Sequence, residues 1–100
     1  MAGNAEAKEE EKLLRSISMS IVDGVLTRLR FLLGSSHLSY LTISRIVESC
    51  LKLVNDRFSM GGITLSSLIQ QIEDGFFDQE FKKIIDYWEK REKNADIGSR

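Results

Sequence analysis

The side chains most suited to chemistry in this chain of 100 residues are its single cysteine and its single histidine. Cys50 lies within an apolar stripe that has helical spacing, which predicts a buried and inert thiol. His37 stands in a polar segment without a cysteine or serine in a nucleophile context, so we expect no catalytic role for it. One cysteine and one histidine provide neither an internal disulfide nor the ligand set of a zinc site.

The carboxylates suggest a second kind of chemistry, which is metal binding. Residues 56–67 have the outline of a calcium loop, with Asp56 in the first place and Gly61 in the sixth. The third, fifth and twelfth places, which need carboxylates, hold Phe58, Met60 and Ser67. The carboxylates near the later turns suit helix ends and caps better than an acid–base pair; they are Glu73, Asp74 and Asp78. We therefore predict no metal, no cofactor and no enzymatic activity.

The composition is that of one small globular domain. Hydrophobic residues make up 42% of the chain and charged residues 29%, which separates it from disordered chains. The net charge of −1 gives no electrostatic basis for binding nucleic acid, and no apolar run is long enough to cross a membrane. The acidic N-terminal segment lacks the apolar core of a signal peptide, so we expect a cytoplasmic protein.

Hydrophobic residues recur with helical spacing along the whole chain, and nothing in the pattern favours a strand. Helices are predicted at 9–21, 24–33, 42–58, 64–74 and 78–93, with a brief helical turn within 35–40. The N-caps expected for the last three helices are Thr42, Thr64 and Asp78. Because the connections are short, neighbouring helices should run antiparallel. We predict an all-α fold, a compact antiparallel six-helix bundle over residues 9–94, between a disordered acidic tail at 1–8 and a disordered tail at 95–100.

An aromatic residue in the second predicted helix interrupts its polar face. At about 100° per residue, the apolar side chains gather on one face: Val25, Leu26, Leu29, Leu32 and Leu33. Phe31 falls on the opposite face, between Arg28 and Arg30. We interpret Phe31 as a partner-docking point. The alternative is that Phe31 packs beneath the short segment that contains Leu38 and Tyr40.

The same residues carry a resemblance to a known family. The pattern Leu26-x-x-Leu29-Arg30-Phe31-Leu32, which follows Leu13-Leu14-Arg-Ser16-Ile17-Ser18, resembles the first two helices of a death effector domain. That family has Leu-x-x-Leu-Lys-Phe-Leu in its second helix, and the likeness extends over residues 10–93. The resemblance implies homotypic docking through Phe31 and Leu32.

The resemblance is to a divergent member of that family. Death effector domains carry an Arg-x-Asp-Leu motif at the start of the sixth helix, linked to an acid in the second. Here the matching residues are Asp78-Gln79-Glu80-Phe81, and Val25 stands at the position of the acid. Only Glu80 and Phe81 keep the character of the motif.

We therefore expect a non-enzymatic interaction domain that docks with similar death-fold domains, or with itself, to assemble apoptotic or inflammatory signalling complexes. The residues expected at the docking surface are Phe31, Leu32, Arg28, Arg30, Arg45, Glu48, Lys52 and Glu80. One alternative is a helical adaptor, similar to paired amphipathic helix or harmonin-homology modules, whose groove binds an amphipathic peptide helix. A DNA-binding regulator is a weaker alternative, because residues 65–71, which would read the bases, contain no Lys or Arg.

Overall fold

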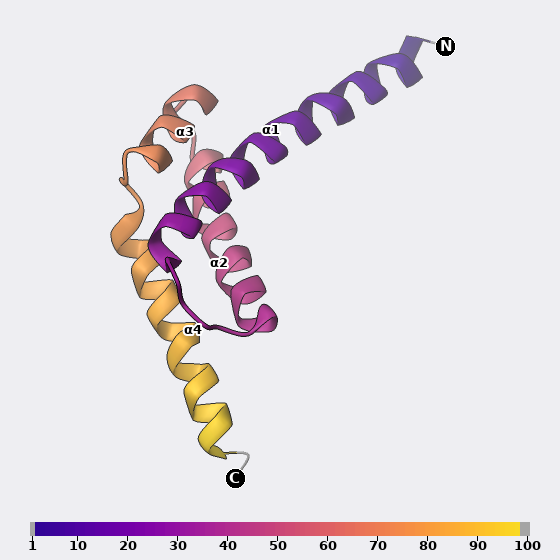
Figure 1. The fold of residues 1–100 in the computed structure, drawn as a ribbon. Helices are drawn as coiled ribbons and strands as arrows, with labels where there is room; N and C mark the ends of the chain where they lie inside the picture. Colours follow the sequence, from indigo (N-terminus) through magenta and orange to yellow (C-terminus); the bar gives the residue numbers. More distant parts are fainter. Residues whose placement is uncertain (1, 99–100) are drawn as a thin grey trace.

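Four helices make up the fold in a computed structural model that describes the backbone of residues 2–98 and the side chains of residues 8–94. They are α1 (Ala2–Leu33), α2 (Tyr40–Ser59), α3 (Leu65–Glu73) and α4 (Asp78–Gly98). No strand occurs within the described backbone, so the predicted all-α class is confirmed. Helices α2 and α4 lie side by side and run antiparallel, while the second half of α1 packs across them and α3 (Figure 1).

The prediction of six helices is wrong, for two physical reasons. The segments 9–21 and 24–33 belong to one continuous helix, α1, which passes through Gly24. A glycine inside a helix costs only about 1 kcal/mol relative to alanine, and here it lies against Ile72 of α3. Residues 35–39 contain no helical turn, because the chain crosses from α1 to α2 as an extended connection.

Two of the three predicted caps are also corrected. Thr64 is the N-cap of α3, as expected, and its hydroxyl accepts from the backbone N–H of Ser67. The N-cap of α2 is Ser39 and not Thr42; Thr42 is a buried residue of the first turn. Asp78 is the first residue of α4, and its carboxylate accepts hydrogen bonds from the guanidinium of Arg28.

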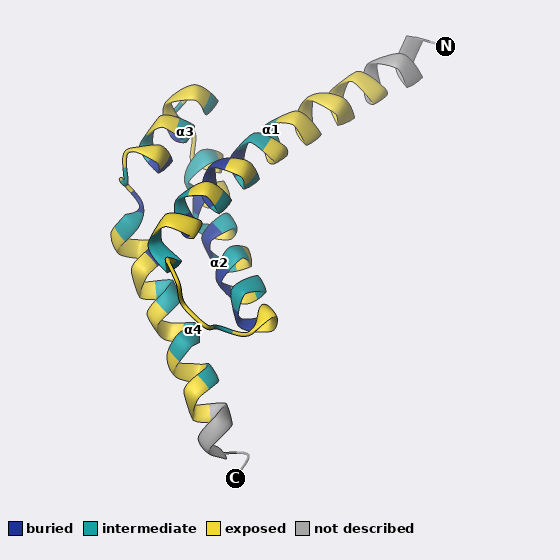
Figure 2. Cartoon of the chain, viewed as in Figure 1, coloured by how far each residue is buried: buried dark blue, intermediate teal, exposed yellow. Residues whose placement is uncertain are grey.

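The hydrophobic core draws on all four helices and on the turn before α4, and the predicted apolar faces point into it (Figure 2). Its buried members are Ile21, Val25, Leu29, Ile46, Cys50, Val54, Leu68, Ile72, Phe77 and Phe81. Leu13 and Leu14 continue the predicted stripe, yet each is 62% exposed. Their part of α1 extends beyond the packed body, so no helix covers them.

This projection lengthens an otherwise compact molecule. The radius of gyration is 16.7 Å and the longest extent is 61 Å, whereas a chain of this length that is compact throughout has a radius near ~13 Å. Residues 2–8 and 95–98 of the predicted tails fall within the bounds of α1 and α4. The side chains of residues 1–7 and 95–100, and the backbone of residues 1, 99 and 100, lie outside the described part of the chain.

Candidate docking surfaces

Phe31 lies on the surface of α1, where the helical spacing predicts it. Its side chain is 71% exposed, and Tyr40, beneath which it was alternatively expected to pack, is itself 87% exposed. The predicted exposure is therefore confirmed and the packing alternative is wrong. Leu32 behaves differently, since it is half-buried and packs against the core. Of this Phe–Leu pair, only Phe31 is mainly exposed to solvent.

Arg28 is held beside Phe31 by a carboxylate from another helix. Its Nε donates to Oδ1 of Asp78 at 2.8 Å, and its Nη2 donates to Oδ2 of the same residue. The guanidinium carbon lies 4.7 Å from the centre of the Phe31 ring, within range of a cation–π interaction. The hydrogen bond to Arg28 lowers the pKa of Asp78 and raises the pKa of Arg28.

This ion pair joins two helices. Asp78 is the first residue of α4, and Arg28 lies on α1. Arg28 and Asp78 are separated by 50 positions in the sequence. No local pattern therefore predicts that they are in contact.

Gly75 makes room for the ion pair. It has a φ of +87°, and a Cβ added to it would lie 2.9 Å from Nη2 of Arg28 and 2.9 Å from Oδ2 of Asp78. Both the backbone conformation and the space therefore favour glycine. The sequence marks Gly75 as the end of a helix but gives no sign of this second role.

A shallow groove of about 300 Å³ lies next to Phe31, where α1 meets the end of α3. Its lining residues are Gly24, Thr27, Arg28, Phe31 and Glu73. Gly24 lines the groove without a side chain, and a Cβ added to it would lie 3.9 Å from the nearest atom of Ile72. An aromatic ring, a fixed guanidinium and a small hollow thus share one face.

The other residues expected at the docking surface do not line this groove. Arg30 lines a separate hollow with Leu33 and Leu38. Glu48 and Lys52 are exposed on α2, and Glu80 is exposed in the first turn of α4. The structure therefore brings together Phe31 and Arg28 out of the predicted set and leaves the others on different faces.

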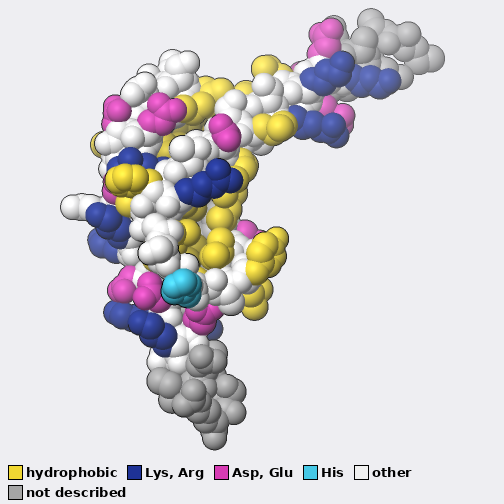
Figure 3. Space-filling model, in the orientation of Figure 1, with side chains coloured by type: hydrophobic (Ala, Val, Ile, Leu, Met, Phe, Trp, Pro, Cys, Tyr) yellow, Lys and Arg dark blue, Asp and Glu magenta, His cyan; other side chains and the backbone are white. Residues whose placement is uncertain are grey.

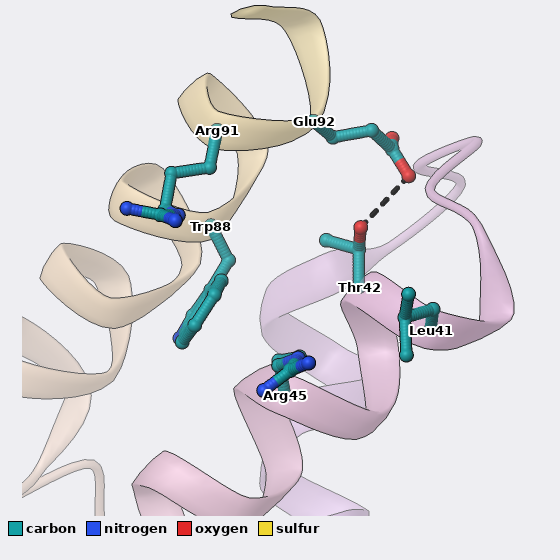
Figure 4. A pocket seen from close by; sticks show the side chains of 6 residues that line it. All are labelled: Leu41, Thr42, Arg45, Trp88, Arg91 and Glu92. Atoms are coloured by element: carbon teal, nitrogen blue, oxygen red, sulfur yellow. Dashed lines mark hydrogen bonds between the residues drawn. The ribbon is translucent and has the colours of Figure 1, made fainter. Parts of the chain in front are cut away.

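Arg45 contributes to a second surface, the Trp88 pocket, which lies between the start of α2 and the later turns of α4 (Figure 4). The pocket has a volume of about 280 Å³ and is lined by Leu41, Thr42, Arg45, Trp88, Arg91 and Glu92. The guanidinium carbons of Arg45 and Arg91 each lie 5.6 Å from the Trp88 ring centre. The indole N–H donates to the Ser49 hydroxyl at 3.1 Å, which fixes the ring against α2.

Glu92 attaches α4 to the start of α2. Its Oε1 accepts from the backbone N–H of Ser39 at 2.9 Å and from the hydroxyl of Thr42 at 2.8 Å. Interactions with Ser39, through its side chain first and then its backbone N–H, and with the Thr42 hydroxyl lower the pKa of Glu92. A carboxylate near a helix N-terminus is also favoured by the helix dipole. Trp88, Arg91 and Glu92 are not among the residues predicted for a site, because their roles depend on residues of α2.

Two residues that were candidates for catalysis or metal binding, Cys50 and Asp74, have structural roles. Cys50 is fully buried, as predicted, and burial raises the pKa of its thiol to about 12. Asp74 is the C-cap residue of α3 and accepts from Gln70. Within the part of the chain that the structure describes, no group of three or more His, Cys, Asp or Glu side chains could hold a metal ion. In the same residues, no helix has the length and apolar character needed to span a membrane.

Comparisons of the chain with models of protein families, with curated protein sequences and with solved structures find no match. The site is therefore interpreted from its own geometry.

Proposed function

We propose that this chain is a non-enzymatic protein-interaction domain of the cytoplasm that docks through the Phe31 face, defined as Phe31, Arg28 and the adjoining groove. Its partner is a helical domain of the same kind, including a second copy of this chain. The resemblance to death effector domains suggests apoptotic or inflammatory signalling as the setting.

The observation that supports this proposal is the 71% exposure of Phe31 beside a guanidinium already bound to Asp78. Buried aromatic rings contribute much of the free energy of protein–protein binding. Because Asp78 fixes Arg28, the polar side of the contact is ordered before binding and loses little conformational entropy on docking. Phe31 enters a shallow apolar pocket on the partner, and the groove at Gly24 receives a partner side chain.

The test is the substitution Phe31→Asp. The side chain is exposed and contributes little to the core, so we expect the helical content and the melting temperature to stay near those of the wild type. Self-association, followed by static light scattering over a concentration series, should become roughly 30-fold weaker, as for the loss of an interface aromatic residue worth about 2 kcal/mol.

Met19→Asp is the matched control, because Met19 lies on the same helix and is also 71% exposed, but does not line the Phe31 groove. It should associate like the wild type. Equal association of the wild type and the Phe31 variant at every concentration would contradict the proposal. Unfolding of the Phe31 variant would do so as well, since it would make Phe31 a core residue.

A second candidate function follows from the groove itself. The hollow of about 300 Å³ at Gly24 lies next to Phe31, an arrangement that also suits one face of an amphipathic peptide helix. The two candidates differ in stoichiometry. Docking between similar domains produces concentration-dependent assembly, whereas peptide binding leaves a monomer with one peptide bound.

A further inference from the structure

Two surfaces away from the Phe31 face lack partners, and they lie at opposite ends of the molecule (Figure 1). One is the projecting part of α1, with Glu9, Glu10 and Glu11 followed by Leu13 and Leu14. The other is the Trp88 pocket, between α2 and α4. The packed body of the molecule lies between them, so they do not meet within one chain.

The projecting part of α1 has an uncovered apolar face. Leu14 precedes Ile21 and Val25 by 7 and 11 positions, which places all three on one side of a helix. Ile21 and Val25 are buried in the core, while Leu14 is 62% exposed. Figure 3 shows hydrophobic side chains interleaved with charged ones along this projection. An isolated helical segment is marginally stable in water, so a partner that covers this face would also stabilise the helix.

The side of the projection that carries the leucines is acidic, while Lys8, Lys12 and Arg15 fall on its other side. The Trp88 pocket is basic at Arg45 and Arg91. Glu10 lies one helical turn before Leu13 and Leu14, so a surface that covers the leucines also meets carboxylates. Glu9, Glu10 and Glu11 are all exposed. Within the described side chains, none of the three forms a salt bridge.

The Trp88 pocket has the complementary chemistry. Arg45 and Arg91 are exposed and form no salt bridge with any described carboxylate. The carboxylate that lines the pocket, Glu92, accepts hydrogen bonds from Thr42 (Figure 4) and from the backbone N–H of Ser39. Leu41, one of the lining residues, is 65% exposed. Arg91 donates to the Tyr87 hydroxyl at 3.2 Å. Two guanidinium groups without a carboxylate partner beside an exposed leucine match a segment of adjacent glutamates and leucines.

We infer that the projecting part of α1 from one copy binds the Trp88 pocket of the next copy. The carboxylates of Glu10 and Glu11 lie against Arg45 and Arg91, and Leu13 and Leu14 cover Leu41. The contact joins two different surfaces, so each copy keeps one free surface of each kind, and the copies add head to tail into open chains. This assembly uses none of the residues of the Phe31 face and is a separate interface.

The experiment is carried out on the full chain with Phe31→Asp in place, which removes the proposed docking through Phe31. Sedimentation velocity over concentrations up to about 1 mM should show species larger than a dimer, and these should decrease as salt screens the charges. Two further variants then each remove one side of the contact. The first adds Glu10→Arg and Glu11→Arg, and the second adds Arg45→Gln and Arg91→Gln, so that the two altered surfaces carry no complementary charges.

Each of these two variants alone should be a monomer with unchanged helical content by circular dichroism. An equal mixture of the two should form a dimer with one copy of each and nothing larger, because one intact surface remains on each partner. The inference is overturned if the Phe31→Asp protein is a monomer throughout, if either variant alone still assembles, or if the mixture stays monomeric. The first of these results leaves the Phe31 proposal standing, and equal assembly with and without Phe31→Asp contradicts only that proposal.

Discussion

The Phe31 face and the Trp88 pocket each place an aromatic ring beside arginine, and they differ in what the arginine already binds. Arg28 donates two hydrogen bonds to Asp78, so its charge is neutralised within the protein and its main effect is to position the Phe31 ring. Arg45 and Arg91 form no ion pair with a described carboxylate. Their charge is available to an acidic partner.

The two aromatic rings also differ, in their exposure and in their contacts with the rest of the protein. Phe31 is 71% exposed and makes no hydrogen bond, whereas Trp88 is half-buried against the core and donates to Ser49. An exposed ring beside a neutralised charge favours apolar docking, and a half-buried ring beside arginines without a carboxylate partner favours electrostatic recognition. The two proposed interfaces should therefore differ in their dependence on salt.

The largest difference in stability should appear when each ring is replaced by alanine in a separate variant. Trp88→Ala removes packing between α4 and α2 as well as the hydrogen bond to Ser49, and we expect a loss of about 3 kcal/mol in the free energy of unfolding. Phe31→Ala should change it by less than about 0.5 kcal/mol, because the ring is exposed. Urea unfolding followed by circular dichroism measures both values. Equal losses for the two variants would show that the rings do not differ in their structural role.

Two glycine substitutions provide the next comparison. They should change the free energy of unfolding in opposite directions. Gly75→Ala would place a Cβ against Arg28 and Asp78 at a φ of +87°, and it should cost about 1–3 kcal/mol. Gly24→Ala lies in a helix, with Ile72 no closer than 3.9 Å, and should stabilise the fold by about 0.5–1 kcal/mol. Thermal melts of the two variants test the pair. A stabilised Gly75 variant would mean that the Arg28–Asp78 contact moves without cost.

The apolar core was predictable from the sequence because burial follows helical spacing. Val25, Leu29 and Phe81 each fall on the faces that a period of 3.6 residues predicts, and all are buried. The exposure of Phe31 follows from the same rule. The fusion of two predicted helices through Gly24 was not predictable, since a local cost of about 1 kcal/mol does not show whether another helix packs against that position.

The parts of the two surfaces that the sequence could not predict are contacts between distant residues. Arg28 and Asp78 are 50 positions apart, and Ser39 and Glu92 are 53 positions apart. The spacing of charged residues carries little information on such pairs, because most charged side chains remain in solvent. The Trp88 pocket depends on the packing of α2 against α4, so it becomes visible only in the folded chain.

The smallest expected effect is a loss of stability in acid. It compares one carboxylate at each surface. Hydrogen bonds lower the pKa of Asp78 in the Phe31 face and of Glu92 at the Trp88 pocket. The unfolded chain therefore binds a proton at each position at a higher pH than the folded chain does. The stability that each carboxylate contributes is present above its ordinary pKa, 3.8 for Asp78 and 4.5 for Glu92. It is lost as the pH falls through the lower value of the folded state.

Asp78→Asn and Glu92→Gln separate the two contributions. Each variant should be less stable than the wild type near pH ~7, with a melting temperature lower by roughly a few degrees. Each difference should shrink as the solution is acidified, and the Glu92 difference should begin to shrink at the higher pH because glutamate has the higher ordinary pKa. Melting curves from neutral to acidic pH measure both. A difference that stays constant with pH would mean that the substitution acts through shape and not through the charge of the carboxylate.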